Sequence, residues 1–131
     1  MKGQYLAVES VLTFAMGLSL AITTLAIFTN YQNSIDTTTE NKERKIVNNR
    51  IKSAIYDLNS SHSGNKLLEL PEDIGGKDYT VTINQEIKTI TASEEFSTSI
   101  SNFETYDMSG SVSGGDARLY KTGRKYVLRS E

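Results

Sequence analysis

The sequence contains no cysteine and no tryptophan, and it has one proline and one histidine. Without cysteine the chain has no disulfide framework, no thiolate nucleophile and no cysteine-bound metal centre. A single histidine excludes sites built on a histidine pair and leaves one side chain that titrates near neutral pH. The 14 basic and 16 acidic residues give a formal net charge of -2 and no general basic surface for nucleic acid. We therefore expect no enzyme, no cofactor, no metal site and no nucleic-acid partner.

The hydrophobic residues, 37% of the chain, are concentrated near the N-terminus. The 26 residues between Glu9 and Asp36 carry no formal charge, and the segment Val11 to Phe28 has 13 apolar side chains among 18 residues. As a helix, 18 residues span roughly 27 Å, close to the thickness of the hydrocarbon layer of a membrane. Tyr5 and Tyr31 flank the stretch, where interfacial aromatic residues are usual. The pattern predicts a membrane-competent hydrophobic helix over residues 4–35.

Two simpler explanations of this helix remain open. A cleaved secretory signal has a shorter apolar stretch followed by a small-residue cleavage site, which the segment after Phe28 lacks. A plain signal anchor would hold a domain outside the membrane, with Lys2 favouring a cytoplasmic N-terminus. A plain anchor leaves Glu9 unexplained, except as a carboxylate at the membrane edge, since a charge inside the bilayer is costly.

The run KGQYLAVESVLTF, Lys2 to Phe14, resembles the start of archaeal type IV pilin-like proteins with class III signal peptides. The resemblance implies that a prepilin-type peptidase removes a short basic leader, residues 1–3, ending at Lys2-Gly3. Gln4 would then be the first mature residue, and Glu9 the acidic residue near the new amino terminus. The hydrophobic helix would be retained, first as a membrane anchor and then as the core of a filament.

The position of the cleaved bond has two alternatives. A cut after Gly3 makes Glu9 the sixth mature residue, whereas the family's usual spacing makes it the fifth and places the cut after Gln4. One residue turns a helix by about 100°, so the choice changes where the carboxylate points. On either alternative, Glu9 would pair with the new amine of a neighbouring subunit, or with its own amine.

The resemblance implies a structural subunit of an archaeal type IV pilus-like surface filament, with a role in adhesion or surface interaction. Its partners would be copies of itself in a helical polymer, the membrane before assembly, the prepilin-type peptidase and the pilus assembly machinery. Its location would be the cell surface, first anchored in the membrane and then in an extracellular filament. The competing interpretation is a single-span membrane-anchored surface protein, or an accessory of a secretion or motility apparatus, that does not polymerise.

Gly17 is a second candidate assembly residue within the hydrophobic helix. Glycine inside a helix costs about 0.5–1 kcal/mol relative to alanine. Its neighbours Ala15, Ser19 and Ala21 are also small, as contacts between membrane helices prefer. Gly17 then marks a close helix–helix approach or a softening of the helix, unless it is incidental, because glycine is frequent in membrane helices.

Residues 36–65 are predicted to form an amphipathic helix and a loop. Val47, Ile51, Ile55 and Leu58 recur at helical spacing on one face, and a loosening is expected near residues 37–39. We expect the charged residues to be solvated on the other faces: Glu40, Lys42, Glu43, Arg44, Lys45, Arg50, Lys52 and Asp57. The loop covers residues 60–65.

The end of this helix carries one candidate modification site. Asn59-Ser60-Ser61 fits the N-x-[ST] acceptor pattern, so Asn59 is a glycosylation candidate if the domain is exported. The one histidine, His62, has no partner at motif spacing, and we expect it to be exposed in the loop.

Residues 66–131 read as a domain of short β-strands. Strands are expected at residues 67–70, 79–83, 87–92, 94–102, 106–113, 117–121 and 125–129, the last two as a hairpin. The glycine-rich run 110–115 lacks the lysine and helix of a phosphate-binding loop and reads as a turn. We expect an all-antiparallel sheet of five to seven strands, completed by the amphipathic helix. The fold class is therefore α+β and pilin-like.

Overall fold

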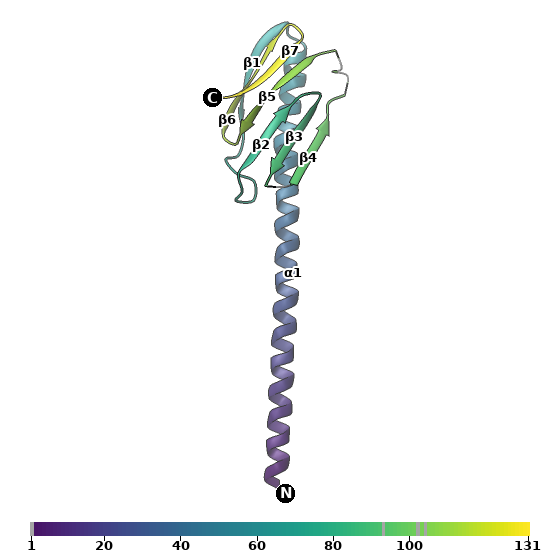
Figure 1. The fold of residues 1–131 in the computed structure, drawn as a ribbon, viewed down its shortest axis with the longest axis vertical. Helices are drawn as coiled ribbons and strands as arrows, with labels where there is room; N and C mark the ends of the chain where they lie inside the picture. Colours follow the sequence, from purple (N-terminus) through teal and green to yellow (C-terminus); the bar gives the residue numbers. More distant parts are fainter. Residues whose placement is uncertain (1, 93, 102, 104) are drawn as a thin grey trace. The chain divides into compact units, whose positions relative to one another are not determined.

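The computed structural model describes residues 2–92, 94–101, 103 and 105–131, which form one helix and seven strands (Figure 1). The chain divides into two compact units, with the boundary between Thr38 and Thr39. The elements are α1 (Lys2–Asn59), β1 (Ser63–Glu69), β2 (Tyr79–Ile83), β3 (Glu86–Thr91), β4 (Glu94–Ser99), β5 (Asp107–Ser113), β6 (Asp116–Thr122) and β7 (Lys125–Ser130). A long N-terminal apolar helix and a seven-stranded mixed sheet place the protein in the α+β class.

Helix α1 is continuous across the boundary between the units. No proline or glycine occurs between Gly17 and Asn59, so nothing in the sequence forces a break. The predicted loosening near residues 37–39 is not seen, because the helix persists there. The hydroxyls of Thr37 and Thr38 instead donate to the carbonyls of Asn33 and Ser34 at 2.9 and 2.8 Å.

The sheet has the order β1-β6-β7-β5-β2-β3-β4. The prediction of an all-antiparallel sheet is wrong at one position, because β5 and β7 are parallel. The hairpin β6–β7 turns back so that β7, rather than β6, lies beside β5. The first half of β5 pairs with β7 and its second half, residues 111–113, pairs with β2.

Gly110 lies at the point where β5 changes partners. Its φ of +129° is in the region that favours glycine, and a Cβ there would overlap the main chain of Leu128 in β7. The close approach of β5 to β7 therefore requires glycine at this position.

The predicted strand positions are confirmed within a few residues for β2 to β7, while residue 102 of the predicted strand 94–102 lies outside the described residues. The prediction for β1 is wrong at its start, since the strand begins at Ser63 inside the expected loop. Residues 63–66 pair with residues 119–122 of β6, so the pairing outweighs their weak strand preference. Residues 60–62 are all that remains of the loop between α1 and β1, and His62 is exposed there as predicted.

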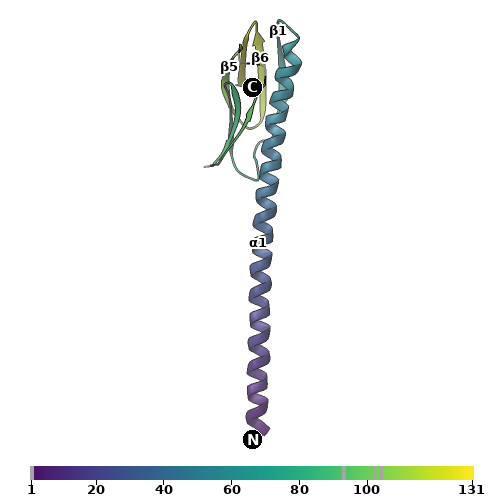
Figure 2. The same cartoon turned by 90° about the vertical axis from the view of Figure 1, so that its right-hand side faces the viewer.

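The core of the second unit lies between its helical segment and one face of the sheet (Figure 2). Val47, Ile51, Ile55 and Leu58 are buried, which confirms the predicted apolar face of the amphipathic helix. They belong to one cluster with inward side chains of the sheet, among them Leu68, Val81, Ile83, Ile87, Val112, Ala117, Leu119, Tyr126 and Leu128. This unit therefore buries its own core without a contribution from residues 2–38.

Three hydrogen bonds hold the helix to the sheet at this core. Asn48 is fully buried, accepts a hydrogen bond from the hydroxyl of Thr89 in β3, and donates to Thr98 in β4 at 3.2 Å. Tyr126 in β7 donates to the carbonyl of Ile55 at 3.4 Å. Such pairing removes the cost of burying these polar groups.

Candidate functional site: an exposed apolar helix

The first unit consists of the part of α1 before Thr39, and its apolar surface is not covered. An 18-residue window of this helix is long and apolar enough to cross a membrane, and none of that window is buried. Its large hydrophobic side chains are all exposed: Tyr5, Leu6, Val8, Val11, Leu12, Phe14, Met16, Leu18, Leu20, Ile22, Leu25, Ile27, Phe28, Tyr31 and Ile35. Covering each of these side chains is worth about 1.5–3 kcal/mol, so the helix is compatible with a membrane anchor or a signal segment.

Five hydroxyl groups on this helix are hydrogen-bonded within the helix itself. Each donates to the carbonyl four residues earlier, at 2.8–2.9 Å, in Ser10, Thr13, Thr23, Thr24 and Thr29. A polar group that is already hydrogen-bonded adds little cost when it enters an apolar environment. These residues therefore do not prevent the helix from packing against lipid or against another apolar helix.

Glu9 is the one charged residue between Lys2 and Asp36, and its side chain is exposed. Its carboxylate makes no ion pair within the described part of the first unit, while its main-chain oxygen accepts the Thr13 hydroxyl. The residues of the predicted leader junction, Lys2, Gly3 and Gln4, form the first turn of α1. Gln4 precedes Glu9 by five residues, or about 7.5 Å along a helix.

Gly17 is exposed, and a Cβ built on it would meet no atom within 4 Å. The chain's own packing therefore gives no reason for glycine at this position, unlike Gly110. The described residues leave open space above Gly17, which is the geometry that a close approach by a second helix requires.

Asn59, the glycosylation candidate, is the last residue of α1 and is exposed. Its main-chain carbonyl accepts a hydrogen bond from Lys121, while the next turn is closed by the Ser61 amide donating to the Leu58 carbonyl at 3.1 Å. The acceptor pattern thus lies at a surface turn.

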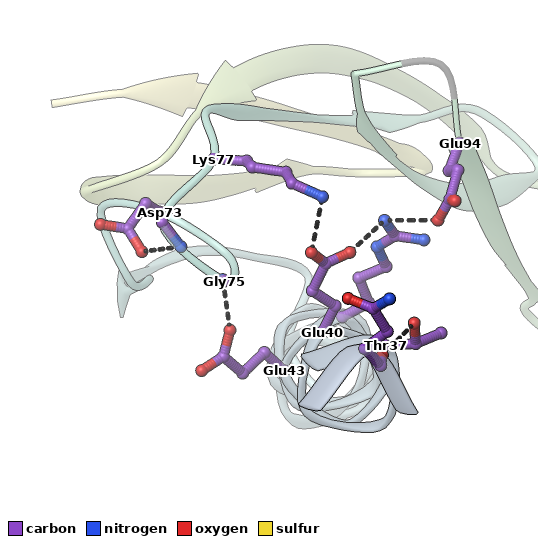
Figure 3. Close-up of polar contacts among 10 residues, drawn as sticks. Thr37, Glu40, Glu43, Asp73, Gly75, Lys77 and Glu94 are labelled. Carbon is purple, nitrogen blue, oxygen red and sulfur yellow. Dashed lines mark hydrogen bonds and ion pairs between the residues drawn. The ribbon is translucent and has the colours of Figure 1, made fainter. Parts of the chain in front are cut away.

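The prediction that the charged residues of the amphipathic helix are all solvated is wrong for Glu40 and Arg44. Their exposed fractions are 9% and 3%. The Glu40 carboxylate accepts from Lys77 at 2.7 Å, and Arg44 contacts Glu40 at 3.4 Å and Glu94 of β4 at 3.1 Å (Figure 3). The hydrogen bond from Lys77, with the charges of Lys77 and Arg44, lowers the pKa of Glu40 below its ordinary value against the opposing effect of burial.

A tight turn at residues 74–77 brings these charges together. Ile74 and Lys77 exchange two main-chain hydrogen bonds of 3.0 and 3.1 Å around Gly75, whose amide donates to Glu43 at 2.7 Å. A Cβ on Gly75 would lie 2.5 Å from Cγ of Glu40. The Glu40 cluster, made of Glu40, Glu43, Arg44, Lys77 and Glu94, fastens this turn and the start of β4 to α1. In the sequence, the pair Gly75-Gly76 is the one signal of such a close approach.

No protein-family model, curated protein or solved structure matches this chain. Over the residues that the structure describes, the chain has one membrane-competent helix and a second compact unit made of helix and sheet.

Proposed function

We propose that this protein is a structural subunit of an archaeal type IV pilus-like surface filament, assembled through its N-terminal hydrophobic helix. The observation that carries the proposal is the contrast between the two units. The second unit buries its own core, while every large apolar side chain on residues 2–38 is exposed. The likeness of Lys2 to Phe14 to the opening of class III signal peptides supports the same function.

The same apolar surface would serve in two environments. Before assembly it would lie in the membrane, and after assembly it would pack against copies of itself. At about 25 cal/mol per Å² of apolar area, packing of this surface contributes on the order of tens of kcal/mol, less the costs of association and ordering. The second unit would then be presented on the filament, where adhesion or surface interaction takes place.

Glu9 is the residue that would fix the axial position of neighbouring subunits. Removal of the leader after Gly3 or Gln4 creates a positively charged amine on the same helix. In an apolar filament core both charges need a partner, since an unpaired buried charge is strongly unfavourable. A pair between subunits satisfies both at one axial offset, whereas a pair with the subunit's own amine would set no offset.

The test replaces the carboxylate by its neutral isostere, Glu9→Gln, in cells that export the protein. Membrane insertion and the fold of the second unit should be unchanged, while surface filaments counted by electron microscopy should fall sharply. Mass spectrometry of the N-terminus should find that Lys2 has been removed from the assembled protein. Normal filaments from Glu9→Gln would mean that Glu9 is only an interfacial carboxylate.

The second candidate is a single-span membrane-anchored surface protein that does not polymerise. The length and exposure of the apolar helix favour it equally. An intact N-terminus on the surface protein, together with a monomeric state in membranes, would establish this candidate and contradict the filament.

A further inference from the structure

The segment of α1 in the second unit has a face that carries lysines and no carboxylate. Lys42, Lys45 and Lys52 are spaced by three and seven residues, which places them on one side of a helix. Lys42 is about 160° around the helix from the buried Glu40, so this side points away from the Glu40 cluster. Lys42 and Lys45 are exposed, Lys52 is half-buried, and Tyr56 on the same side is 43% exposed. We call Lys42, Lys45, Lys52 and Tyr56 the lysine face.

The carboxylates of this helical segment are all engaged within the second unit. Glu40 binds Lys77 and Arg44, Glu43 accepts from the Gly75 amide, and Asp57 pairs with Lys66. Lys42, Lys45 and Lys52, by contrast, form no ion pair with any described residue. The face therefore presents positive charge that the chain itself does not neutralise.

An acidic surface lies on the same unit, in the loop between β1 and β2. Glu72, Asp73 and Asp78 are exposed and form no ion pair with described residues, although Asp73 accepts from the Gly76 amide. The one base of the loop, Lys77, is held by Glu40. Glu72 and Asp78 line a common hollow. We call Glu72, Asp73 and Asp78 the acidic loop.

We propose that the lysine face of one subunit docks on the acidic loop of a second copy of this chain. The occupant is a second copy because the two surfaces have opposite charge and both are unneutralised on the same unit. When such a contact is not reciprocated it is heterologous, and in a helical filament, where the rotation between subunits does not close, it propagates from copy to copy along an open array. This inference rests on the proposed filament and adds a contact between its second units.

The contact would set orientation more than total affinity. Exposed ion pairs contribute little each, but complementary charge steers association and disfavours wrong alignments. Residues 42–52 extend about 15 Å along the helix, so the lysine face permits only a narrow range of axial offsets. Raising the salt concentration should weaken the contact, because exposed charges are screened.

The test reverses each charged surface in the full-length chain and then both together. Lys42→Glu with Lys45→Glu, and separately Glu72→Lys with Asp78→Lys, should each reduce filament yield about tenfold. The four substitutions combined should restore the yield to within about threefold of the wild type. Lys125→Glu with Arg129→Glu, the same charge change as the double lysine variant but at two exposed sites of β7, is the control and should leave the yield unchanged.

A second measurement identifies the contact directly. A carbodiimide joins an amine to a carboxylate that it already touches, and mixed isotope-labelled subunits distinguish links between copies from links within one. Mass spectrometry of cross-linked filaments should find Lys42 or Lys45 joined to Glu72 or Asp78 of another copy. The thermal unfolding of each variant should match the wild type, since all the replaced side chains lie at the surface.

The outcomes separate this inference from the proposed function. A wild-type chain that stays monomeric overturns the filament and this contact with it. Filaments that form normally in both reversed variants, or variants that the combined change does not rescue, overturn the contact and leave the filament standing. Loss caused by the lysine variant alone would mean that the lysines face another anionic surface, such as lipid phosphate, which also overturns the contact.

Discussion

Lys121 joins the end of α1 to the sheet, and its replacement should destabilise the second unit strongly. Its exposed fraction is 4%, and its ammonium donates to the carbonyls of Leu58 at 3.0 Å, Asn59 at 3.0 Å and Ser61 at 2.5 Å. The last carbonyls of a helix have no partner within it, and a cation there also interacts favourably with the helix dipole. The change Lys121→Met keeps the length of the side chain but removes the donor.

The size of the effect follows from these contacts. Hydrogen bonds to a charged group contribute roughly 1.5–3 kcal/mol each. The ammonium also lies 5.7 and 5.5 Å from the ring centroids of Tyr106 and Tyr126, within the range of cation–π attraction. Three such bonds, offset by the cost of burying the ammonium, give an expected loss of about 3 kcal/mol in the free energy of unfolding. For a domain of this size that lowers Tm by roughly 12–24 °C.

The assay is thermal unfolding of the full chain in detergent, followed by the near-ultraviolet circular dichroism of its tyrosines. Lys125→Met removes an exposed lysine from the same hairpin and should change the free energy of unfolding by less than about 0.5 kcal/mol. If Lys121→Met were as stable as this control, the ammonium would not hold the end of α1, and the reasoning from its three contacts would be wrong.

Three further changes probe other features. Gly17→Leu should leave membrane insertion intact and lower filament yield, and an unchanged yield would contradict close helix contact at this residue. The lowered pKa of Glu40 stabilises the fold above the ordinary glutamate pKa of about 4.3, and this stabilisation is lost as pH falls through the lowered value. The difference in unfolding free energy between wild type and Glu40→Gln should therefore be constant near neutral pH and shrink below about pH 4; a constant difference there would refute the role of the carboxylate. The hydrogen bond from Lys77 is the main cause of the lowered Glu40 pKa. The pKa of Lys77 is itself raised, so the stability that Lys77 contributes is present at neutral pH and is lost only in strong alkali. Both Gly110→Ala and Gly76→Ala should lower the free energy of unfolding by about 1–3 kcal/mol through backbone strain, because both glycines have positive φ. Gly110→Ala should lower it further, because its Cβ would also overlap β7 whereas Gly76 has open space. Equal melting temperatures of the two variants would contradict the close approach of β5 to β7.

Local patterns were sufficient to predict the elements of this fold. The apolar spacing of Val47, Ile51 and Ile55 identified the face that the structure buries. Alternation placed β2 at residues 79–83, and the same pattern reached the ends of most other strands within a few residues. These signals work because a helix face or a strand face repeats at a fixed residue spacing, which needs no information about distant partners.

The order of the strands could not be predicted in the same way. Two glycines, Gly114 and Gly115, separate β5 from β6, and a short turn usually joins neighbouring antiparallel strands. The structure instead places β7 between β5 and β6. The partners of β5 are β7 along its first half and β2 along its second half. The sequence places Gly110 both in the expected strand 106–113 and in the glycine-rich run 110–115, and neither pattern predicts its need for a bare backbone, which depends on β7.

The charges of α1 show why the candidate surfaces also required the fold. A pair such as Glu40 and Arg44, four residues apart, is typical of a solvated helix face. The partners that bury it, Lys77 and Glu94, are 37 and 50 residues away, so no local pattern reveals them. Once the tertiary contacts engage the three carboxylates of this segment, its lysine face is left with positive charge that no described residue pairs. The charge that a surface presents to a partner therefore depends on which charged side chains are paired within the folded unit, and not on the number of charges along the chain.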